Sequence, residues 1–238
     1  VGNEKYKANA SYADMIESDV KEIKVLDTVS HSDAEAVLER YELADGAITV
    51  TASTSDGKIL RKIIVGKEST TGSQTYVKLD SSKDILLVSG SLKDVFGKSV
   101  DELRSKEVFR FDNKEISKVS VEGDTGKWSV EAKDLSAESI EWNVSGISEK
   151  LDDSKITTWV NSLPILNVES WGNTDKVPDT KPTTVKITKS DKTVEVSIYP
   201  VQDGENTQYF ATSSETPYTF TLSKYMAEKF IKNPADLK

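Results

Sequence analysis

The 238-residue sequence contains no cysteine, a single histidine and no long apolar run. Without cysteine the chain has no disulfide, no thiolate nucleophile and no zinc site built from thiolates. One imidazole, that of His31, cannot by itself form a mononuclear histidine metal site. A transmembrane helix needs about 20 consecutive apolar residues, and no stretch approaches that length. The sequence therefore predicts no metal site and no cofactor.

Positive charge is scarce relative to negative charge. There are 31 Lys and Arg residues against 40 Asp and Glu residues, which gives a formal net charge of −9. Affinity for nucleic acid comes largely from Lys and Arg side chains that neutralise phosphates. We therefore expect neither nucleic acid nor an anionic lipid surface as a partner. Hydrophobic residues at 36% and charged residues at 30% are ordinary for a soluble globular chain.

An internal repeat is the strongest feature that the sequence does contain. The order strand, strand, helix in residues 65–110 recurs near the C-terminus, and repeats of this kind define the architecture of a chain. Matched residues keep a spacing of 134 or 135: Gln74 with Gln208, Ser89 with Ser223, Phe96 with Phe230, Val50 with Val185 and Ile63 with Ile198. Further upstream, the helical pattern that starts at Ile16 matches the one that starts at Ile156, at a spacing of 140.

The repeat predicts the fold class and two domains. We expect an α+β fold of two tandem diverged repeats, residues 1–107 and 108–238, each an antiparallel sheet packed against a helix. The second copy begins with about three strands ahead of its helix, whereas the first begins almost at its helix. We therefore predict that the first repeat is truncated at its N-terminus, that the natural chain extends upstream of Val1, and that an exposed strand edge results.

Periodicity and turn residues place the individual elements. Ser11 is expected to cap a helix from Tyr12 to Leu26, before a break at residues 29–32. Ser91 is expected to cap a short helix, and Asp152 or Asp153 to cap another that ends near Leu163. The remaining expected helices cover 33–41 and 224–231, and the expected strands cover 48–51, 59–65, 76–79, 85–88, 116–122, 127–131, 139–144, 184–188, 193–199, 208–212 and 218–222.

Short motifs spread over most of the chain carry a family resemblance. They are residues 10–16 (ASYADMI), 38–43 (LERYEL), 56–58 (DGK), 65–67 (VGK), 72–79 (GSQTYVKL), 103–106 (LRSK), Phe109, 111–112 (FD) and 127–128 (KW). With them the chain resembles a bacterial family known only as a domain of unknown function, often found duplicated. In that family the segment at Tyr41 usually reads Tyr-Gly-Leu, and here Glu42 replaces the glycine, so the local turn is expected to differ.

The resemblance implies a location and an association but no reaction. Some members are encoded beside, or fused to, gliding-motility-type ABC transporter components. Members look like extracytoplasmic domains tethered to the cell membrane by one N-terminal transmembrane helix, which implies such an anchor upstream of Val1. No catalytic set of residues comes with the resemblance.

No motif in the sequence has the pattern of a catalytic or phosphate-binding site. His31 could form a triad with Ser30 or Ser32 and Asp33, but adjacent residues rarely meet in that geometry, and an exposed loop histidine is the simpler interpretation. The abundant carboxylates are interpreted as a solvated acidic surface. Residues 66–73 contain Gly, Lys, Ser and Thr, but in an order typical of a hairpin loop.

Tryptophan supplies the one candidate ligand-binding residue. Trp128, Trp142 and Trp159 lie in expected strands or on an apolar helix face, where core packing is the ordinary role. Trp171 lies beside the loop of residues 172–182, where an indole could stack on a sugar or anchor a peptide.

The leading hypothesis is a non-enzymatic, extracytoplasmic binding or scaffold module with a protein partner in the membrane or envelope. It rests on the duplicated sheet, the acidic surface, the lack of a recognisable catalytic set and the resemblance. The alternative is a carboxylate-dependent hydrolase or carbohydrate-processing enzyme, which would use two carboxylates near Trp171. A third is a structural spacer with neither pocket nor apolar patch.

Overall fold

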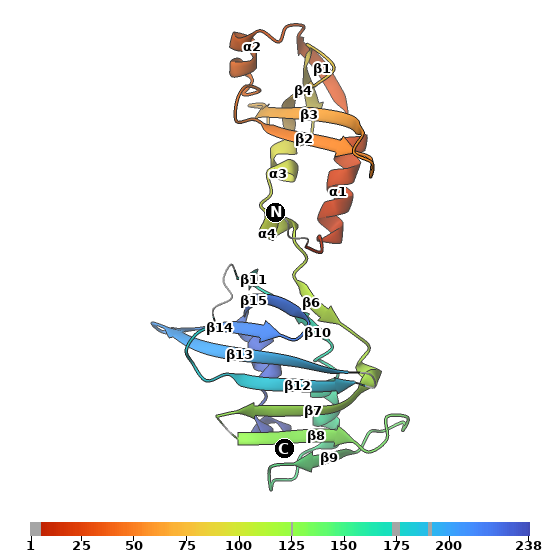
Figure 1. Ribbon diagram of the computed structural model, residues 1–238, viewed down its shortest axis with the longest axis vertical. Coiled ribbons are helices and arrows are strands. Elements are labelled where there is room, and N and C mark those ends of the chain that lie inside the picture. Colours follow the sequence, from red (N-terminus) through yellow and green to blue (C-terminus); the bar gives the residue numbers. More distant parts are fainter. Residues whose placement is uncertain (1–5, 125, 173–176, 190–191) are drawn as a thin grey trace. The chain divides into compact units, whose positions relative to one another are not determined.

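The structure is a computed structural model that describes residues 6–124, 126–172, 177–189 and 192–238. The chain divides into two compact units, Val1–Ser105 (unit 1) and Lys106–Lys238 (unit 2). Few and short helices accompany sheets whose described strand pairs are antiparallel (Figure 1). The division falls after Ser105, two residues before the position suggested by the sequence pattern.

Unit 1 is built on a five-stranded sheet, against which α3 packs. The strand order is β1-β5-β4-β3-β2, so β1 and β2 form the two edges. Alternating residues of the inner strands make the core, which includes Ile63, Val65, Val77 and Val88, and Leu92 packs on them from α3. The elements are α1 (Ala10–Lys21), β1 (Val25–Ser30), α2 (Glu35–Arg40), β2 (Ile48–Ser53), β3 (Ile59–Glu68), β4 (Gln74–Leu79), β5 (Ile85–Ser89), α3 (Leu92–Phe96) and α4 (Val100–Leu103).

The first helix ends five residues earlier than its apolar periodicity predicts. The prediction of a helix as far as Leu26 is wrong, because residues 25–30 form β1 and pair with β5. Arg61 Nη1 donates to the carbonyl oxygens of Val20 at 2.7 Å and Lys21 at 3.2 Å, which satisfies acceptors that the end of α1 leaves free. Beyond that point β-branched residues favour an extended backbone.

Two predicted helix caps are also wrong. The side chain of Asn9, and not that of Ser11, accepts the free amides at the start of α1. Ser91 occupies the cap position of α3 but makes no side-chain capping bond. Instead the buried hydroxyl of Thr75 accepts from the amide of Leu92 at 3.0 Å and donates to the carbonyl of Gly90 at 2.6 Å. A long-range contact therefore does what a local cap was expected to do.

The turn after α2 needs a left-handed backbone conformation. Glu42 has a φ of 55°, which lies in the left-handed region that residues other than glycine adopt at an energetic cost. Glu42 Oε2 accepts from Lys93 Nζ at 2.9 Å, and this hydrogen bond lowers the pKa of the Glu42 carboxyl. The turn also brings the Tyr41 carbonyl against Gly66, where an added Cβ would lie only 2.2 Å from the oxygen. Only glycine fits at residue 66.

Unit 2 contains an eight-stranded sheet of order β11-β15-β14-β13-β12-β7-β8-β9, and a small sheet of β10 with β6. Helices α5 and α6 pack against it. The elements are β6 (Glu107–Arg110), η1 (Asn113–Glu115), β7 (Ile116–Gly123), β8 (Gly126–Ala132), β9 (Trp142–Ser145), α5 (Asp153–Val160), β10 (Ile165–Asn167), β11 (Ser170–Trp171), β12 (Thr183–Lys189), β13 (Thr193–Asp203), β14 (Asn206–Ser213), β15 (Thr216–Leu222), α6 (Lys224–Phe230) and η2 (Pro234–Leu237).

Two stacked indoles hold α5 on the sheet. The ring centres of Trp128 in β8 and Trp159 in α5 lie 5.3 Å apart, and the ring planes are inclined at 29° to each other. Trp159 Nε1 donates to the carbonyl of Lys229 at 3.0 Å, and Trp142 Nε1 donates to Thr157 Oγ1 at 2.9 Å. The buried Nε1 of Trp128 has no acceptor among the described residues. The helix cap at Asp152 forms as predicted, with Asp152 Oδ1 accepting from the amide of Lys155 at 3.0 Å.

Across the described part of the chain, no helix combines the length and apolar character that a membrane span requires.

Replacing Glu42 with Gly should stabilise unit 1, because glycine adopts the left-handed conformation without the Cβ clash. We expect the melting temperature to rise by roughly 2–4 °C. Glu42→Ala is the control: it also loses the bond to Lys93 but keeps the backbone strain, so it should lower the melting temperature. Equal effects of the two substitutions, measured by circular dichroism, would contradict the backbone explanation.

Trp159→Phe should destabilise unit 2 more than Trp128→Phe does. The first leaves the Lys229 carbonyl without its donor, whereas the second removes an N–H that has no acceptor. We expect the two free energies of unfolding to differ by about 1–2 kcal/mol. Denaturant titration followed by tryptophan fluorescence measures this, since all four tryptophans lie in unit 2. A larger loss for Trp128→Phe would refute the assignment.

Candidate functional site

The polar face of α5 forms one wall of a pocket in unit 2. Positions four apart in a helix share a face, so Ser154 and Thr158 line up, as do Lys155 and Trp159, and Ser162 follows in the turn after α5. Thr158 Oγ1 donates to the carbonyl of Ser154 at 2.9 Å, and Ser162 Oγ donates to the carbonyl of Trp159 at 2.6 Å. Because their protons point back at the helix, these hydroxyls present acceptor lone pairs to the pocket.

The second wall comes from α6 and the chain after it. Ala227 and Phe230 point into the core of unit 2, so the intervening positions of α6 face outward. Tyr225, with 76% of its surface exposed, forms the rim. Lys232 Nζ lies 3.5 Å from Asp236 Oδ2, which closes one side with an ion pair. The aromatic and charged residues that this wall contributes are Tyr225, Glu228, Lys229, Lys232 and Asp236.

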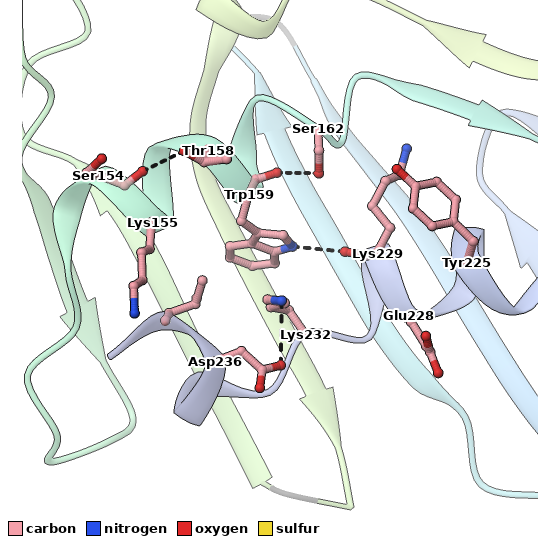
Figure 2. A pocket seen from close by; sticks show the side chains of 11 residues that line it. Ser154, Lys155, Thr158, Trp159, Ser162, Tyr225, Glu228, Lys229, Lys232 and Asp236 are labelled. Atoms are coloured by element: carbon pink, nitrogen blue, oxygen red, sulfur yellow. Dashed lines mark hydrogen bonds and ion pairs between the residues drawn. The ribbon is translucent and has the colours of Figure 1, made fainter.

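Between these walls lies a pocket of about 470 Å³ with the buried indole of Trp159 at its centre (Figure 2). The size falls within the range of sites that bind small molecules or short peptide segments. Lysine side chains and serine and threonine residues line it together with the indole. Lys155 Nζ donates to the Lys238 carbonyl oxygen, and Lys229 Nζ donates to that of Ile165. The arrangement suits a ligand that carries both an anionic group and an apolar or ring-shaped part.

Lys229 has a strongly perturbed pKa. Its Nζ donates to the carbonyl of Ile165 at 2.8 Å and lies 5.0 Å from the centre of the Phe230 ring. Burial disfavours the charged form and lowers its pKa to about 8. Among the described residues no carboxylate lies within ion-pair distance of this ammonium. A half-buried cation with one carbonyl partner is a ready site for an anionic group.

His31 lies on the surface and contacts Asp84, whereas Asp33 was the partner considered from the sequence. Its Nδ1 lies 2.9 Å from Asp84 Oδ1, and its side chain is 82% exposed. Ser30 Oγ donates to the carbonyl of Ser32, while the imidazole contacts the carboxylate of Asp84. The triad of His31 with Ser30 or Ser32 and Asp33 is therefore not assembled, and the exposed-loop interpretation describes what is observed.

Trp171, the candidate ligand-binding residue, forms part of β11. It is partly buried, packs against the unit 2 core and meets the rings of Phe220 and Tyr218 edge-on at 5.9 and 6.3 Å. It lies outside the Lys229 pocket. Residues 173–176 of the adjoining loop lie outside the described residues. The structure thus shows Trp171 in an aromatic cluster at a sheet edge.

The perturbed carboxylates are surface groups with hydrogen-bond partners. Hydrogen bonds that favour the charged form hold the pKa of these carboxyl groups below the ordinary value. The groups are those of Glu17, Glu42, Asp56, Glu102, Asp134, Glu141 and Glu149. Within the described ranges, no three His, Asp or Glu side chains cluster as metal ligands would.

The Lys229 pocket was not predicted from the sequence. Lys229 bonds through its carbonyl to Trp159, a residue 70 positions earlier, so the site exists only when α5 and α6 pack together. In the sequence the Tyr225 and Lys229 pair reads as an ordinary solvated face of a helix. The one available signal was the spacing of Ser154, Thr158 and Ser162 beside the buried Trp159.

Comparison with known proteins gives one match. The family described as Domain of unknown function (DUF4340) matches residues 1–186. No curated protein matches the chain. No solved structure matches it either.

Lys229 should titrate with a midpoint near pH 8, which ¹⁵N-detected NMR of lysine side chains can measure. Lys133 is the control, since its hydrogen bond to Glu141 raises its pKa above the ordinary value. The unfolded chain binds the Lys229 proton more tightly than the native chain, so Lys229 destabilises the fold while charged. Relative to Lys229→Met, stability should therefore rise between about pH 8 and 10.5. An ordinary midpoint would refute the burial argument.

Proposed function

The chain belongs to the family described as Domain of unknown function (DUF4340), and we propose that it is an extracytoplasmic binding or scaffold module serving an ABC transporter or another envelope assembly. The family description names no activity, so the proposal is built on the site. The envelope location and the membrane tether are supported by the sequence resemblance given above. The role is binding, with a protein partner.

The observation that carries the proposal is the pocket around Lys229. It combines a half-buried ammonium, acceptor hydroxyls on α5 and the rim residue Tyr225. A partner segment with an acidic side chain would pair with Lys229 and lay an apolar or aromatic residue against Tyr225 and Trp159 (Figure 2). Tyrosine and tryptophan side chains at such positions supply much of the binding energy in protein interfaces.

The titration of the carboxylates supports binding over hydrolysis. A glycosidase-type mechanism uses a carboxylic acid whose raised pKa keeps it protonated near neutral pH. Glu17, Glu141 and Glu149 are shifted in the opposite direction, because each has a hydrogen-bond partner that favours the charged form. The Lys229 pocket contains two carboxylates, and Asp236 is already paired with Lys232.

We further infer that the two units are diverged copies of one unit. The strand order β1-β5-β4-β3-β2 in unit 1 has the counterpart β11-β15-β14-β13-β12 in unit 2. In both units a helix precedes the first of these strands, and another follows the last hairpin: α1 and α3 in unit 1, α5 and α6 in unit 2. Strand order is independent of residue identity, so it supports the repeat separately from the sequence match.

The pairing registers support the same inference. Thr75 pairs with Val88 in unit 1, and Tyr209 pairs with Leu222 in unit 2, each residue 134 positions later. The next pairs, Tyr76 with Leu87 and Phe210 with Thr221, keep that spacing. In the neighbouring hairpins, β2–β3 and β12–β13, the strand pairing differs by two residues from the sequence match of Ile63 with Ile198. Val50 pairs with Ile63 in unit 1, whereas its match Val185 pairs with Val196 in unit 2.

A crosslinking experiment tests the binding role, and the absence of cysteine makes it specific. A single cysteine at the pocket rim, Glu228→Cys, leaves Tyr225 and Lys229 in place and is labelled in intact cells with a membrane-impermeant maleimide that carries a benzophenone. We expect labelling, because the domain lies outside the cytoplasm, and after irradiation a crosslink to a transporter or envelope subunit. Adding Lys229→Glu should weaken capture about tenfold, because a charge-assisted contact becomes a repulsion.

Leu135→Cys is the matched control, since this residue of unit 2 is 38% exposed and lies outside the pocket. It should be labelled equally but give no specific crosslink. Equal crosslinking from both positions would remove the pocket from the interface. Absence of labelling in intact cells would contradict the location, and a substrate turnover abolished by Lys229→Met would replace the binding role with catalysis.

A further inference from the structure

The α5 wall of the Lys229 pocket offers hydrogen-bond acceptors. Thr158 Oγ1 gives its proton to the carbonyl of Ser154, and Ser162 Oγ gives its proton to the carbonyl of Trp159. A hydroxyl oxygen whose proton is already donated keeps its lone pairs, so both oxygens can accept a hydrogen bond from a ligand. Both residues line the pocket. A ligand that fits this wall therefore brings hydrogen-bond donors.

The α6 wall offers an aromatic ring and a cation on one face of the helix. Tyr225 and Lys229 lie four positions apart in α6, and positions four apart share a face (Figure 2). At a rise of 1.5 Å per residue they are separated by about 6 Å along the helix axis. Tyr225 is exposed at the rim, and Lys229 is half-buried below it. A ligand that fits this wall brings an anion and, about 6 Å away, an apolar group.

Lys229 is the cation that gains most from an incoming carboxylate. The neighbouring Lys232 already has Asp236 at 3.5 Å. Lys155 is exposed, so water hydrates its ammonium group well. Lys229 Nζ is half-buried and donates to the carbonyl of Ile165, which is a neutral acceptor. A poorly hydrated cation loses less hydration when an anion arrives, so the acidic group of a ligand is best placed at Lys229.

An extended peptide segment satisfies both walls at once. Alternate side chains of a strand point to the same side and lie about 6.6 Å apart, which matches the spacing of Tyr225 and Lys229. The backbone N–H groups of an unpaired extended segment are free to donate to Thr158 and Ser162. A helical segment can match the spacing with residues four apart, but beyond its first turn its N–H groups are already bonded within the helix.

We infer that the partner segment binds the Lys229 pocket in an extended conformation, with an acidic residue and an aromatic or large apolar residue separated by one position. The acidic side chain pairs with Lys229, and the apolar one lies against Tyr225. Backbone amides of the segment donate to Thr158 Oγ1 and Ser162 Oγ. The inference rests on the proposed function, because it specifies the kind of partner that the crosslinking from residue 228 captures.

Short peptides of identical composition test the spacing. The probes are Thr-Asp-Thr-Phe-Thr and its reverse, blocked at both ends, because threonine favours an extended backbone and the two orders cover both strand directions. In the control, Thr-Asp-Phe-Thr-Thr, the acid and the ring point to opposite sides of a strand. In NMR titrations of the 238-residue chain, one probe should bind at least about tenfold more tightly than the control.

Three results would overturn the inference. They are equal affinity of probes and control, no binding by any of these peptides, and tighter binding of a helical peptide with Glu and Phe four positions apart. The crosslinking experiment fails separately. A crosslink from residue 228 without a preference among the peptides would keep the binding role and remove the extended mode. A peptide preference without a crosslink would keep the extended mode and remove the envelope partner.

Variants of the pocket assign the contacts to their residues. Thr158→Val keeps the shape but removes the acceptor, so the probe should bind about threefold to tenfold more weakly, whereas Thr158→Ser should bind it unchanged. N-methylation of the donating peptide amide should cost as much, and the two changes together little more than either alone. In Lys229→Met the probe and its Asn counterpart should bind equally. Additive losses, or a retained preference for Asp, would contradict the proposed contacts.

Discussion

The backbone hydrogen bonds between β12 and β7 are the interaction on which unit 2 depends. They join five strands that follow the helix α5 in the sequence to three strands that precede it, and so make one sheet of eight. Because β8 and β9 carry Trp128 and Trp142 beneath α5, the same ladder provides the surface on which that helix rests. The Trp159 indole is held in place in turn, and with it one wall of the Lys229 pocket.

Burial of Lys229 follows from this packing and gives the pocket its chemistry. The Trp159 N–H donates to the carbonyl of Lys229, and the ammonium of Lys229 donates to the carbonyl of Ile165. Lys229 is therefore held at both its backbone and the end of its side chain. An ammonium in this setting is less well solvated than one on the surface, which is why its pKa falls. It also loses less hydration when an anion approaches, and so it is better prepared for binding than the exposed lysines.

Sequence patterns were sufficient to predict strands in which apolar and polar residues alternate, and helix caps made by a residue next to the helix. The strands of residues 116–131 and the helix cap at Asp152 follow from such patterns. They failed at residues 25–30, where helical spacing runs on through Ile23 and Leu26 but pairing with β5 imposes a strand. They also failed at Ser91, whose expected role falls to the distant Thr75. The Lys229 pocket could not be predicted from the spacing of its serine and threonine residues alone, because it depends on how two distant helices pack.

The shared register of the two hairpins β4–β5 and β14–β15 creates a folding problem. Strands that pair in the same way can exchange partners within one chain while it folds, which is a common route to misassembly in repeated domains. Side-chain volume opposes this exchange. Ala211 faces Phe220, whereas Val77 faces Leu86. An exchanged pairing would crowd Val77 against Phe220 and leave Ala211 and Leu86 underpacked, and both errors weaken a core. The different side-chain volumes in the two ladders thus favour the pairing of each strand with its own partner.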